Sequence, residues 1–438
     1  MTQHNYLLLI RLALPIILAN SAVPLLGLVD TAVIGQTGEV SDLGAIALAS
    51  LVFSFVYWGF GFLRMGTTGF IAQAYGANDH DEMHAVVFRT VLLGLLIGLG
   101  LIILQKPIEG IATYFLHASP AVNAGVRDYF YIRIWGAPAT LITFALSGTF
   151  IGMGWTSRLL WVQLLLNGLN MALNVLLVIY LGLGVKGIAL GTVIAEWTAL
   201  VFALFLLLPK MGIRQPWQRL KTLQARVFDK TRLWALFQVN RDIMIRTLAL
   251  ISGFAWFAQQ GASFGDATLA ANHILLQFVS LSAFFLDGYA NVAEMRTGQA
   301  YGAKDKARFQ REVKDSTVLA AITALLLALL LFFYAEMFIS WLSQDLGVQS
   351  TATQYKNLAA LYIFVSFAAF QLDGVFIGVT HTKAMRNSAL IALAVLVSLG
   401  SWWASQYQNT GLWWALIMYV LARAVVLGWC YPAILKKL

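Results

Sequence analysis

Stretches of about 20 predominantly apolar residues recur along the whole chain, and they constrain its fold more than any other feature. A helix of that length, rising 1.5 Å per residue, crosses a hydrocarbon layer of roughly 30 Å. Of the 438 residues, 60% are hydrophobic and 11% are charged, which excludes the mixed surface of a soluble protein. Because the runs lack the alternating pattern of barrel strands, the sequence predicts an all-α polytopic membrane protein.

We expect 12 transmembrane helices. The distribution of basic residues among the loops indicates which side of the membrane each loop faces. The predicted spans cover residues 8–35, 44–72, 84–104, 123–152, 159–181, 187–209, 232–259, 268–296, 312–335, 350–378, 387–407 and 410–434. When loops are assigned alternately to two sides, one side collects most Lys and Arg, and the other keeps Lys106, Lys186 and Lys356. By the positive-inside rule the basic side is cytoplasmic, so both termini are predicted in the cytoplasm.

A basic interruption divides the chain into two halves. Residues 210–232 hold seven basic residues against one acid and form the longest polar stretch. The sequence therefore predicts an N-terminal six-helix bundle over residues 1–209, a cytoplasmic linker over 210–231, and a C-terminal six-helix bundle over 232–438.

Two motifs repeat at one spacing. Gln-Ala-Tyr-Gly-Ala at 73–77 recurs at 299–303, and Gly-Thr-Phe-Ile-Gly at 148–152 recurs as Gly-Val-Phe-Ile-Gly at 374–378, each 226 residues later. Two matches at the same offset indicate duplication. Since each half has an even number of crossings, the repeats are parallel, and such halves can rock against each other around a central cavity.

Several functional classes are excluded or disfavoured. The single cysteine, Cys430, excludes an internal disulfide framework. No Walker A sequence, nucleophile elbow, HExxH or dinucleotide fingerprint occurs, so we predict neither an enzyme nor a resident cofactor. The net charge of +9 comes from loops at the membrane edge and is an orientation signal, so no nucleic-acid partner is expected. The energy source of a transporter of this kind should be an ion gradient.

Asp30 is the strongest candidate for the residue that couples transport to an ion gradient. It follows a long apolar stretch of the first span, where an ionisable group is costly and functional by default. Apolar surroundings disfavour the charged carboxylate, so Asp30 could take up and release a proton near neutral pH. Pro15 and Pro24 precede it and can bend the helix that carries it.

Three neutral polar residues are predicted at a similar depth. Asn170 and Asn174 lie four residues apart and so on one face of the fifth span, and Thr192 lies in the sixth. Together with Asp30 they could form a small hydrated pocket in the outer half of the membrane. The alternative is that Asp30 is a buried packing acid and that the asparagines are ordinary interhelical hydrogen-bond partners.

The second half has its own polar candidates. Asp287 and Asp373, each followed by glycine, are predicted cavity acids. Arg246 and Arg423 are expected to pair with such acids or to extend their charged ends towards water. The tryptophan pairs at 402–403 and 413–414 are typical of an interfacial aromatic belt.

These residues together resemble a known family. Pro15 to Thr31, both Gln-Ala-Tyr-Gly-Ala segments, Asn240-Arg241-Asp242, and Leu372 to Gly378 followed by Met385-Arg386-Asn387-Ser388 are similar to the multidrug and toxic compound extrusion (MATE) transporters, DinF-like bacterial branch. The resemblance covers essentially the whole chain. It implies two bundles enclosing a V-shaped central cleft in a bacterial inner membrane, with alternating access and export of organic cations or hydrophobic compounds in exchange for H⁺ or Na⁺.

The resemblance also assigns roles by position. Asp30 is similar to the first-helix acid that this branch uses for cation coupling, and Asn170, Asn174 and Thr192 fall where its partners lie. Several relatives carry an aspartate where this chain has Asn174, so we favour H⁺, with a Na⁺ site near Asp30 kept open. Asp373 resembles a cation-site acid of another branch.

We expect a monomer whose partners are drug-like small molecules and the lipid bilayer. Two rivals remain open at this point. A flippase for lipids or lipid-linked precursors, from the same superfamily, should carry a cationic cleft for pyrophosphate. A polytopic membrane enzyme would need a catalytic cluster at one membrane surface, and the sequence shows none.

Overall fold

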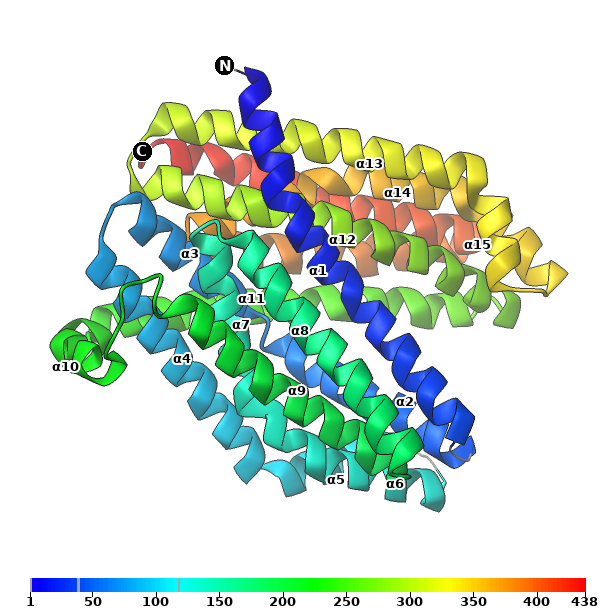
Figure 1. Ribbon diagram of the computed structural model, residues 1–438. Coiled ribbons are helices and arrows are strands. Elements are labelled where there is room, and N and C mark those ends of the chain that lie inside the picture. The colour runs from blue at the N-terminus through cyan, green and yellow to red at the C-terminus, as the bar shows by residue number, and fades with distance from the viewer. Residues whose placement is uncertain (1, 38–39, 117–118) are drawn as a thin grey trace. The chain divides into compact units, whose positions relative to one another are not determined.

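A computed structural model describes residues 2–37, 40–116 and 119–438, with side chains over 5–22, 32–34, 41–114 and 119–438. Every regular element in these residues is a helix (Figure 1). The predicted all-α class is therefore confirmed for the described part of the chain.

The first half is built from helices that match the predicted spans with extra breaks. They are α1 (Thr2–Thr37), α2 (Val40–Gly59), α3 (Phe62–Gly76), α4 (His80–Ile103), α5 (Gln105–Leu116), α6 (Pro120–Arg133), the 3₁₀ turn η1 (Ile134–Gly136), α7 (Ala137–Gly152), α8 (Thr156–Asn174), the π-helical η2 (Val175–Tyr180) and α9 (Gly184–Leu207). The predicted span 44–72 is thus interrupted between α2 and α3, and 123–152 is interrupted at η1.

The second half has longer helices. The linker helix α10 (Pro216–Val227) is followed by α11 (Lys230–Ala262), α12 (Asp266–Gly302), α13 (Lys306–Leu342), α14 (Leu346–Gly378) and α15 (Thr382–Leu435). The last two predicted spans, 387–407 and 410–434, both lie in α15. Non-helical backbone at Gln408 (φ 50°) divides this helix into two arms.

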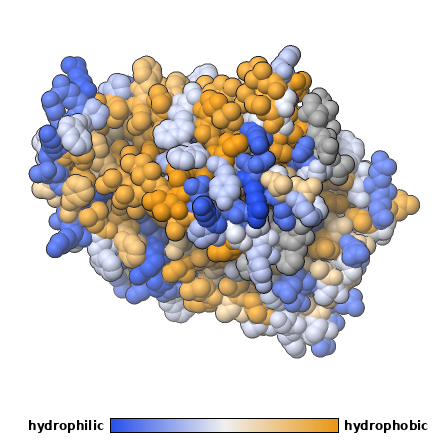
Figure 2. Space-filling model, turned by 90° about the horizontal axis from the view of Figure 1, so that it is seen from below, coloured by the Kyte–Doolittle hydropathy of each residue, from blue (hydrophilic) through white to orange (hydrophobic). Residues whose placement is uncertain are grey.

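The described residues contain 10 helical stretches that are long and apolar enough to cross a membrane. Two further segments are long enough to make up the predicted 12. One is α11, with 33 residues, and the other is the second arm of α15 beyond Gln408. Figure 2 shows apolar side chains over much of the visible surface, as a chain surrounded by lipid requires.

The backbone repeats with the same 226-residue spacing as the sequence motifs. The Asp79 side chain accepts a hydrogen bond from the backbone N–H of Glu82, and Asp305 does the same for Arg308. Pairs of residues with positive φ share the spacing: Asn78 and Lys304, Gly154 and Thr380, Gly182 and Gln408. Turns and helix caps were therefore duplicated along with the spans, which confirms the predicted parallel repeat.

The glycines of the repeated motifs permit close backbone contacts. A Cβ at Gly148 would overlap the carbonyl oxygen of Arg64, and a Cβ at Gly374 would overlap that of Ala290, 226 residues later. The two Gln-Ala-Tyr-Gly-Ala segments also face each other. A Cβ at Gly76 would overlap the Gln299 backbone, and one at Gly302 would overlap that of Gln73. Only glycine allows these helices to approach so closely.

Contacts divide the chain into two compact units that differ from the sequence halves. The C-terminal unit consists of Met1–Ile17, Ala72–Asn78 and Phe237–Leu438. The N-terminal unit consists of Leu18–Ile71 and Asp79–Leu236. The division falls inside α1, after Pro15, so this one helix contributes to both units.

Each unit has its own apolar core. In the C-terminal unit α14 packs against α12, α13 and α15, which run side by side in Figure 1. Trp413, one of the tryptophans expected in the interfacial belt, is fully buried in this core, and its Nε1 donates to Asn272 Oδ1 at 2.9 Å. That expectation was wrong for Trp413 because the sequence pattern cannot tell which face of a helix meets other helices. Trp402 is 60% exposed, as the belt requires.

The predicted linker contains an ordered helix. α10 packs against α4 in the N-terminal unit, with Leu223 and Val227 buried against Ala85. Arg226 Nη1 lies 3.0 Å from Asp79 Oδ1, and Arg219 pairs with Asp81. The basic stretch is therefore fixed to the N-terminal end of α4 by both apolar and ionic contacts.

Candidate functional site

Three of the predicted site residues form one hydrogen-bonded chain in the N-terminal unit. Asn174 Nδ2 donates to Asn170 Oδ1 at 2.8 Å along one face of α8. Asn170 Nδ2 then donates to Thr192 Oγ1 of α9 at 2.9 Å, and the Thr192 hydroxyl donates to the Ile188 carbonyl at 2.8 Å. All three side chains are buried. We call Asn170, Asn174 and Thr192 the polar relay, because each member donates to the next.

The backbone around the relay is shaped to hold it. A Cβ at Gly191 of α9 would overlap Asn174 Oδ1, so the glycine allows α8 and α9 to meet at this point. Directly after Asn174 the chain changes to the π-helical η2, which leaves the regular α-helical ladder. Short π-helical segments are frequent at functional sites. Sequence reasoning missed Gly191 and η2, since neither has a motif.

The charged partner proposed for the relay lies outside the residues whose side chains are described. Asp30 and Pro24 belong to α1, which continues through their positions as one helix from Thr2 to Thr37, and nothing is described of their side chains. Pro15 is described and lies in the same helix, half-buried. The structure therefore brings together the three neutral members of the predicted pocket.

Asp373, a predicted cavity acid, is engaged by two arginines. Arg246 of α11 and Arg423 of α15 both donate to the same carboxylate oxygen, Asp373 Oδ2 on α14. The side chains of Arg246, Arg423 and Asp373 are 11%, 6% and 7% exposed. We call these three residues the arginine cluster. Its formal charge of +1 disfavours a cation at Asp373.

Asp287, the other predicted cavity acid, is less constrained. It lies half-buried in α12, and Asn291 Nδ2 donates to its backbone carbonyl at 2.8 Å and to its Oδ2 at 3.4 Å. An amide donor leaves the carboxylate charge uncompensated, so Asp287 stays a candidate acid of the second half.

A balanced ion pair lies in the N-terminal unit. Arg133 donates to both carboxylate oxygens of Glu196, at 2.5 and 2.6 Å. Its guanidinium also lies over the rings of Phe53 and Tyr57, at 5.2 and 5.3 Å from their centroids. Two parallel bonds and two aromatic faces satisfy this buried charge, so the pair acts as a structural connection between α6 and α9. Because Arg133 and Glu196 are 63 residues apart in the chain, the sequence does not show that they pair.

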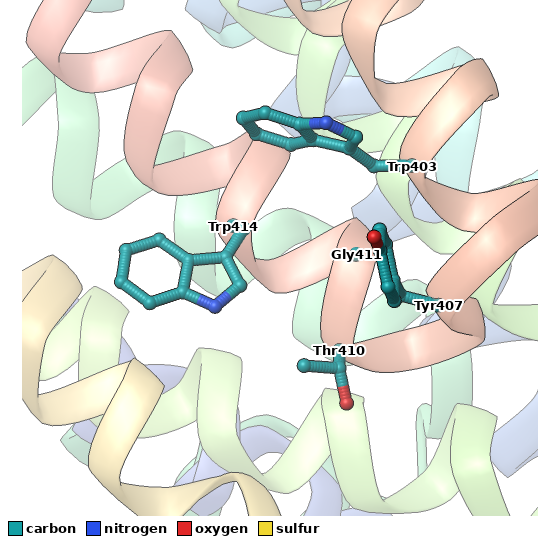
Figure 3. A pocket seen from close by; sticks show the side chains of 5 residues that line it. All are labelled: Trp403, Tyr407, Thr410, Gly411 and Trp414. Atoms are coloured by element: carbon teal, nitrogen blue, oxygen red, sulfur yellow. The ribbon is translucent and has the colours of Figure 1, made fainter.

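Metal ligation has no support in the described residues, which contain no group of three or more His, Cys, Asp and Glu side chains that could hold an ion. A separate apolar pocket of about 310 Å³ lies beside Gln408 in α15. It is lined by Trp403, Tyr407, Thr410, Gly411 and Trp414 (Figure 3). Its aromatic rings surround an open space with almost no polar surface, which suits an acyl chain or a flat apolar group.

Comparison with known proteins gives consistent results. A family model described as MatE matches residues 15–176 and 247–403. The chain is 35% identical over 421 residues to DNA damage-inducible protein F of Escherichia coli (strain K12), covering 95% of this chain and 90% of that protein. It is 24% identical over 445 residues to the probable multidrug resistance protein NorM of Xylella fastidiosa (strain 9a5c), covering 98% and 92%.

Solved structures agree in fold. A crystal structure of MATE in the bent conformation has a TM-score of 0.88 at 19% identity, covering 98% of this chain and 96% of that chain. A structure of MATE in the straight conformation has a TM-score of 0.85 at 18% identity, covering 98% and 97%.

Proposed function

Because the chain belongs to the MatE family of multidrug efflux transporters, we propose that it is a secondary active antiporter that exports organic cations or other hydrophobic compounds in exchange for H⁺. Its relatives are transporters and not enzymes. The proposal places this multi-pass protein in the bacterial inner membrane as a monomer, with both termini in the cytoplasm and drug-like cargo entering from the cytoplasm or the inner leaflet.

The observation that carries the proposal is the buried polar relay. Its members are amides and a hydroxyl, so it has no charge of its own and can reorient its hydrogen bonds. A protonated carboxyl can donate to an amide oxygen such as Asn174 Oδ1, whereas an ionised carboxylate can only accept. Protonation of Asp30 would therefore change the hydrogen bonding of α1 to α8 and α9.

The repeat supports a position for Asp30 close to the relay. The residues 226 positions after Asp30 and Asn174 are Trp256 and Gly400. These two counterparts touch, because a Cβ at Gly400 would lie 2.5 Å from Cη2 of Trp256. Since turns, caps and glycine contacts recur with this spacing, the duplication predicts the same approach of Asp30 to Asn174 in the first half.

The proposed cycle uses α1 as its moving element. Ionised Asp30 attracts a cationic cargo in the inward-open state. A proton arriving from the outside then neutralises Asp30, changes its bonds to the relay and bends α1 near Pro15 and Pro24, which releases the cargo. Related MATE structures were obtained in bent and in straight conformations, which is consistent with a bending step in this family.

Proton coupling fits the relay better than sodium coupling. Na⁺ is held by several oxygen ligands, and a second carboxylate stabilises it, whereas the members of the polar relay, Asn174 included, are neutral. One carboxylate with neutral neighbours is sufficient for a proton.

The test is transport of ethidium in proteoliposomes with H⁺ and Na⁺ gradients imposed independently. We expect an H⁺ gradient alone to drive ethidium movement, and Asp30→Asn to lose at least about tenfold of the rate, since the variant has no exchangeable proton. Asp266→Asn, which removes an exposed acid at the start of α12, is the matched control and should keep the wild-type rate. Full H⁺-driven transport by Asp30→Asn would refute the coupling role.

A further inference from the structure

The arginine cluster carries an excess positive charge inside the C-terminal unit. Arg246 and Arg423 share one carboxylate oxygen of Asp373. Within the described residues, the ion pairs of both arginines involve Asp373 and no second carboxylate. An uncompensated charge buried in a membrane protein is costly, so a cluster of this kind marks a functional site.

Two buried donors in this region have no hydrogen-bond partner within the described residues. They are the hydroxyl of Tyr419, which is fully buried, and Nε of Arg246. Leaving such donors unpaired costs about 1–3 kcal/mol each, so they are expected to have a partner in a working state of the protein. An anion supplies acceptors for both donors and also neutralises the cluster.

The helices present these groups on one side. Tyr419 and Arg423 lie four residues apart on α15 and so share a face. The Tyr419 hydroxyl points at α11, where a Cβ at Gly253 would lie 3.1 Å from it. Gly253 is two turns from Arg246 on the same helix, and the lack of a side chain there allows the Tyr419 hydroxyl to pack closely against α11.

The ion pair in the N-terminal unit shows what a completed cluster looks like. Glu196 takes two bonds from Arg133, the formal charges cancel, and the guanidinium lies over two aromatic rings. Arg246, Arg423 and Asp373 have one carboxylate for two guanidinium groups. A second carboxylate would give them the same one-to-one balance.

We propose that Arg246, Arg423 and Tyr419 form a binding site for one carboxylate of a hydrophobic organic acid. The carboxylate accepts hydrogen bonds from both arginines and from the tyrosine hydroxyl, while Asp373 keeps one oxygen on the guanidinium pair. The apolar body of the acid packs against neighbouring aromatic side chains, of which Tyr362 lies close to Arg423. The chemical class recognised here is an aromatic monocarboxylate, opposite in charge to the cargo of the coupling cycle proposed above. The site concerns binding, so it does not depend on proton-coupled transport.

The experiment measures binding to the full-length protein in phosphatidylcholine nanodiscs. The probes are 1-naphthoate and the cation 1-naphthylmethylammonium, which have similar shape and opposite charge. We expect naphthoate to bind at least about tenfold more tightly at the cluster, as two charge-assisted bonds suggest. The absence of naphthoate binding overturns the proposal.

A charge series separates a binding role from a structural one. Arg246→Gln leaves the balanced Arg423–Asp373 pair and should weaken naphthoate binding about tenfold or more. Arg246→Lys keeps the charge and should recover part of the affinity. Unchanged naphthoate affinity in Arg246→Gln contradicts the proposal.

Tyr419→Phe keeps the proposal testable if Arg246→Gln folds poorly. The hydroxyl makes no hydrogen bond in the described residues, so its removal should leave thermal stability unchanged or slightly higher while lowering naphthoate affinity about threefold to tenfold. The matched control is Tyr355→Phe, which changes a different buried tyrosine, in α14, and this variant should bind naphthoate like wild type. If Tyr419→Phe gains stability and binds naphthoate normally, the hydroxyl has no ligand and the proposed site is wrong.

A further arm distinguishes free acids from lipid head groups as the source of the anion. Nanodiscs that contain phosphatidylglycerol provide a phosphate at high local concentration. Competition of this lipid with naphthoate in wild type, and its loss in Tyr419→Phe, would identify the lipid phosphate as a second occupant of the same anion site.

Discussion

The polar relay of the N-terminal unit and the arginine cluster of the C-terminal unit solve the same problem in different ways. Both place polar groups inside a membrane-spanning unit. The relay does so with neutral side chains, where each donor of Asn170, Asn174 and Thr192 has an acceptor. The cluster does so with three charges, two positive and one negative.

This difference shows that the duplication preserved the backbone conformation but not the polar side chains of the two sites. Positive-φ turns, helix caps and glycine contacts recur at 226 residues. The counterparts of Asn170 and Asn174 are Leu396 and Gly400, so the second half has no relay at this place. One ancestral scaffold therefore carries two different polar sites, and the two units can have different ligands.

The largest expected effect comes from removing a charge from the cluster. Asp373→Ala leaves two buried guanidinium groups without a carboxylate and should destabilise the protein by about 3–5 kcal/mol. Asn170→Ala breaks the neutral relay and should cost only about 1–3 kcal/mol, since it leaves uncharged groups unpaired. Unfolding in detergent, followed by tryptophan fluorescence, measures both. Equal losses would contradict the contrast between charged and neutral sites.

A smaller effect is expected from filling the space between α8 and α9. Gly191→Ala places a methyl group against Asn174 Oδ1 and should cost about 1–3 kcal/mol. It should also slow H⁺-driven transport, because the relay must shift. The control is Gly168→Ala in α8, where a Cβ meets nothing within 4 Å. Gly400→Ala tests the second half. It should cost similar stability by pushing against Trp256, but it should leave proton coupling intact.

The smallest effect is a pH dependence that arises at His381 in the C-terminal unit. His381 lies between α14 and α15, outside the spans, and its ring stacks on Phe376 with centroids 5.8 Å apart. Burial lowers the pKa of His381, and Lys437 and Lys383 lower it further. The unfolded chain therefore binds the proton more readily. The contribution of His381 to stability is present above about pH 6.5 and is lost as the pH falls through the folded-state value.

The measurement is the midpoint of thermal unfolding between pH 7.5 and 5. His381→Gln should lose less stability on acidification than wild type, whereas His273→Gln, at an exposed histidine of α12, should behave like wild type. The first-half counterpart of His381 is Trp155, which cannot titrate, so this position contributes no acid sensitivity to the N-terminal unit. The same acid loss in His381→Gln as in wild type would exclude the histidine as its source.

Sequence reasoning predicted the features that depend on local pattern. Apolar runs gave the spans, the repeated glycine motifs gave the duplication, and the spacing of Asn170 and Asn174 placed both on one face of α8, where they meet. The sequence was less able to predict which face of each helix packs against other helices. The pattern put Trp413 in the interfacial belt, yet it is buried against Asn272, because a long apolar helix does not reveal which face meets its neighbours.

Contacts between residues far apart in the chain could not be predicted from the sequence either. Arg423 lies 50 residues from Asp373, and Arg246 lies 127 residues from it. The sequence identified each as ionisable but could not show that both arginines bind one oxygen. Likewise, residues 210–231 have the composition of a linker, and the contact of Leu223 and Val227 with Ala85 helps to explain why part of this stretch forms a packed helix.

Proton release on cargo binding is the most direct test of the account, because it reports whether Asp30 exchanges a proton for a cation. Purified protein in weakly buffered detergent is mixed with ethidium while a pH indicator counts the protons released. The account predicts close to one proton per bound cation in wild type and none in Asp30→Asn, with Asp266→Asn matching wild type. Undiminished release by Asp30→Asn would show that another group carries the proton and would contradict the central claim.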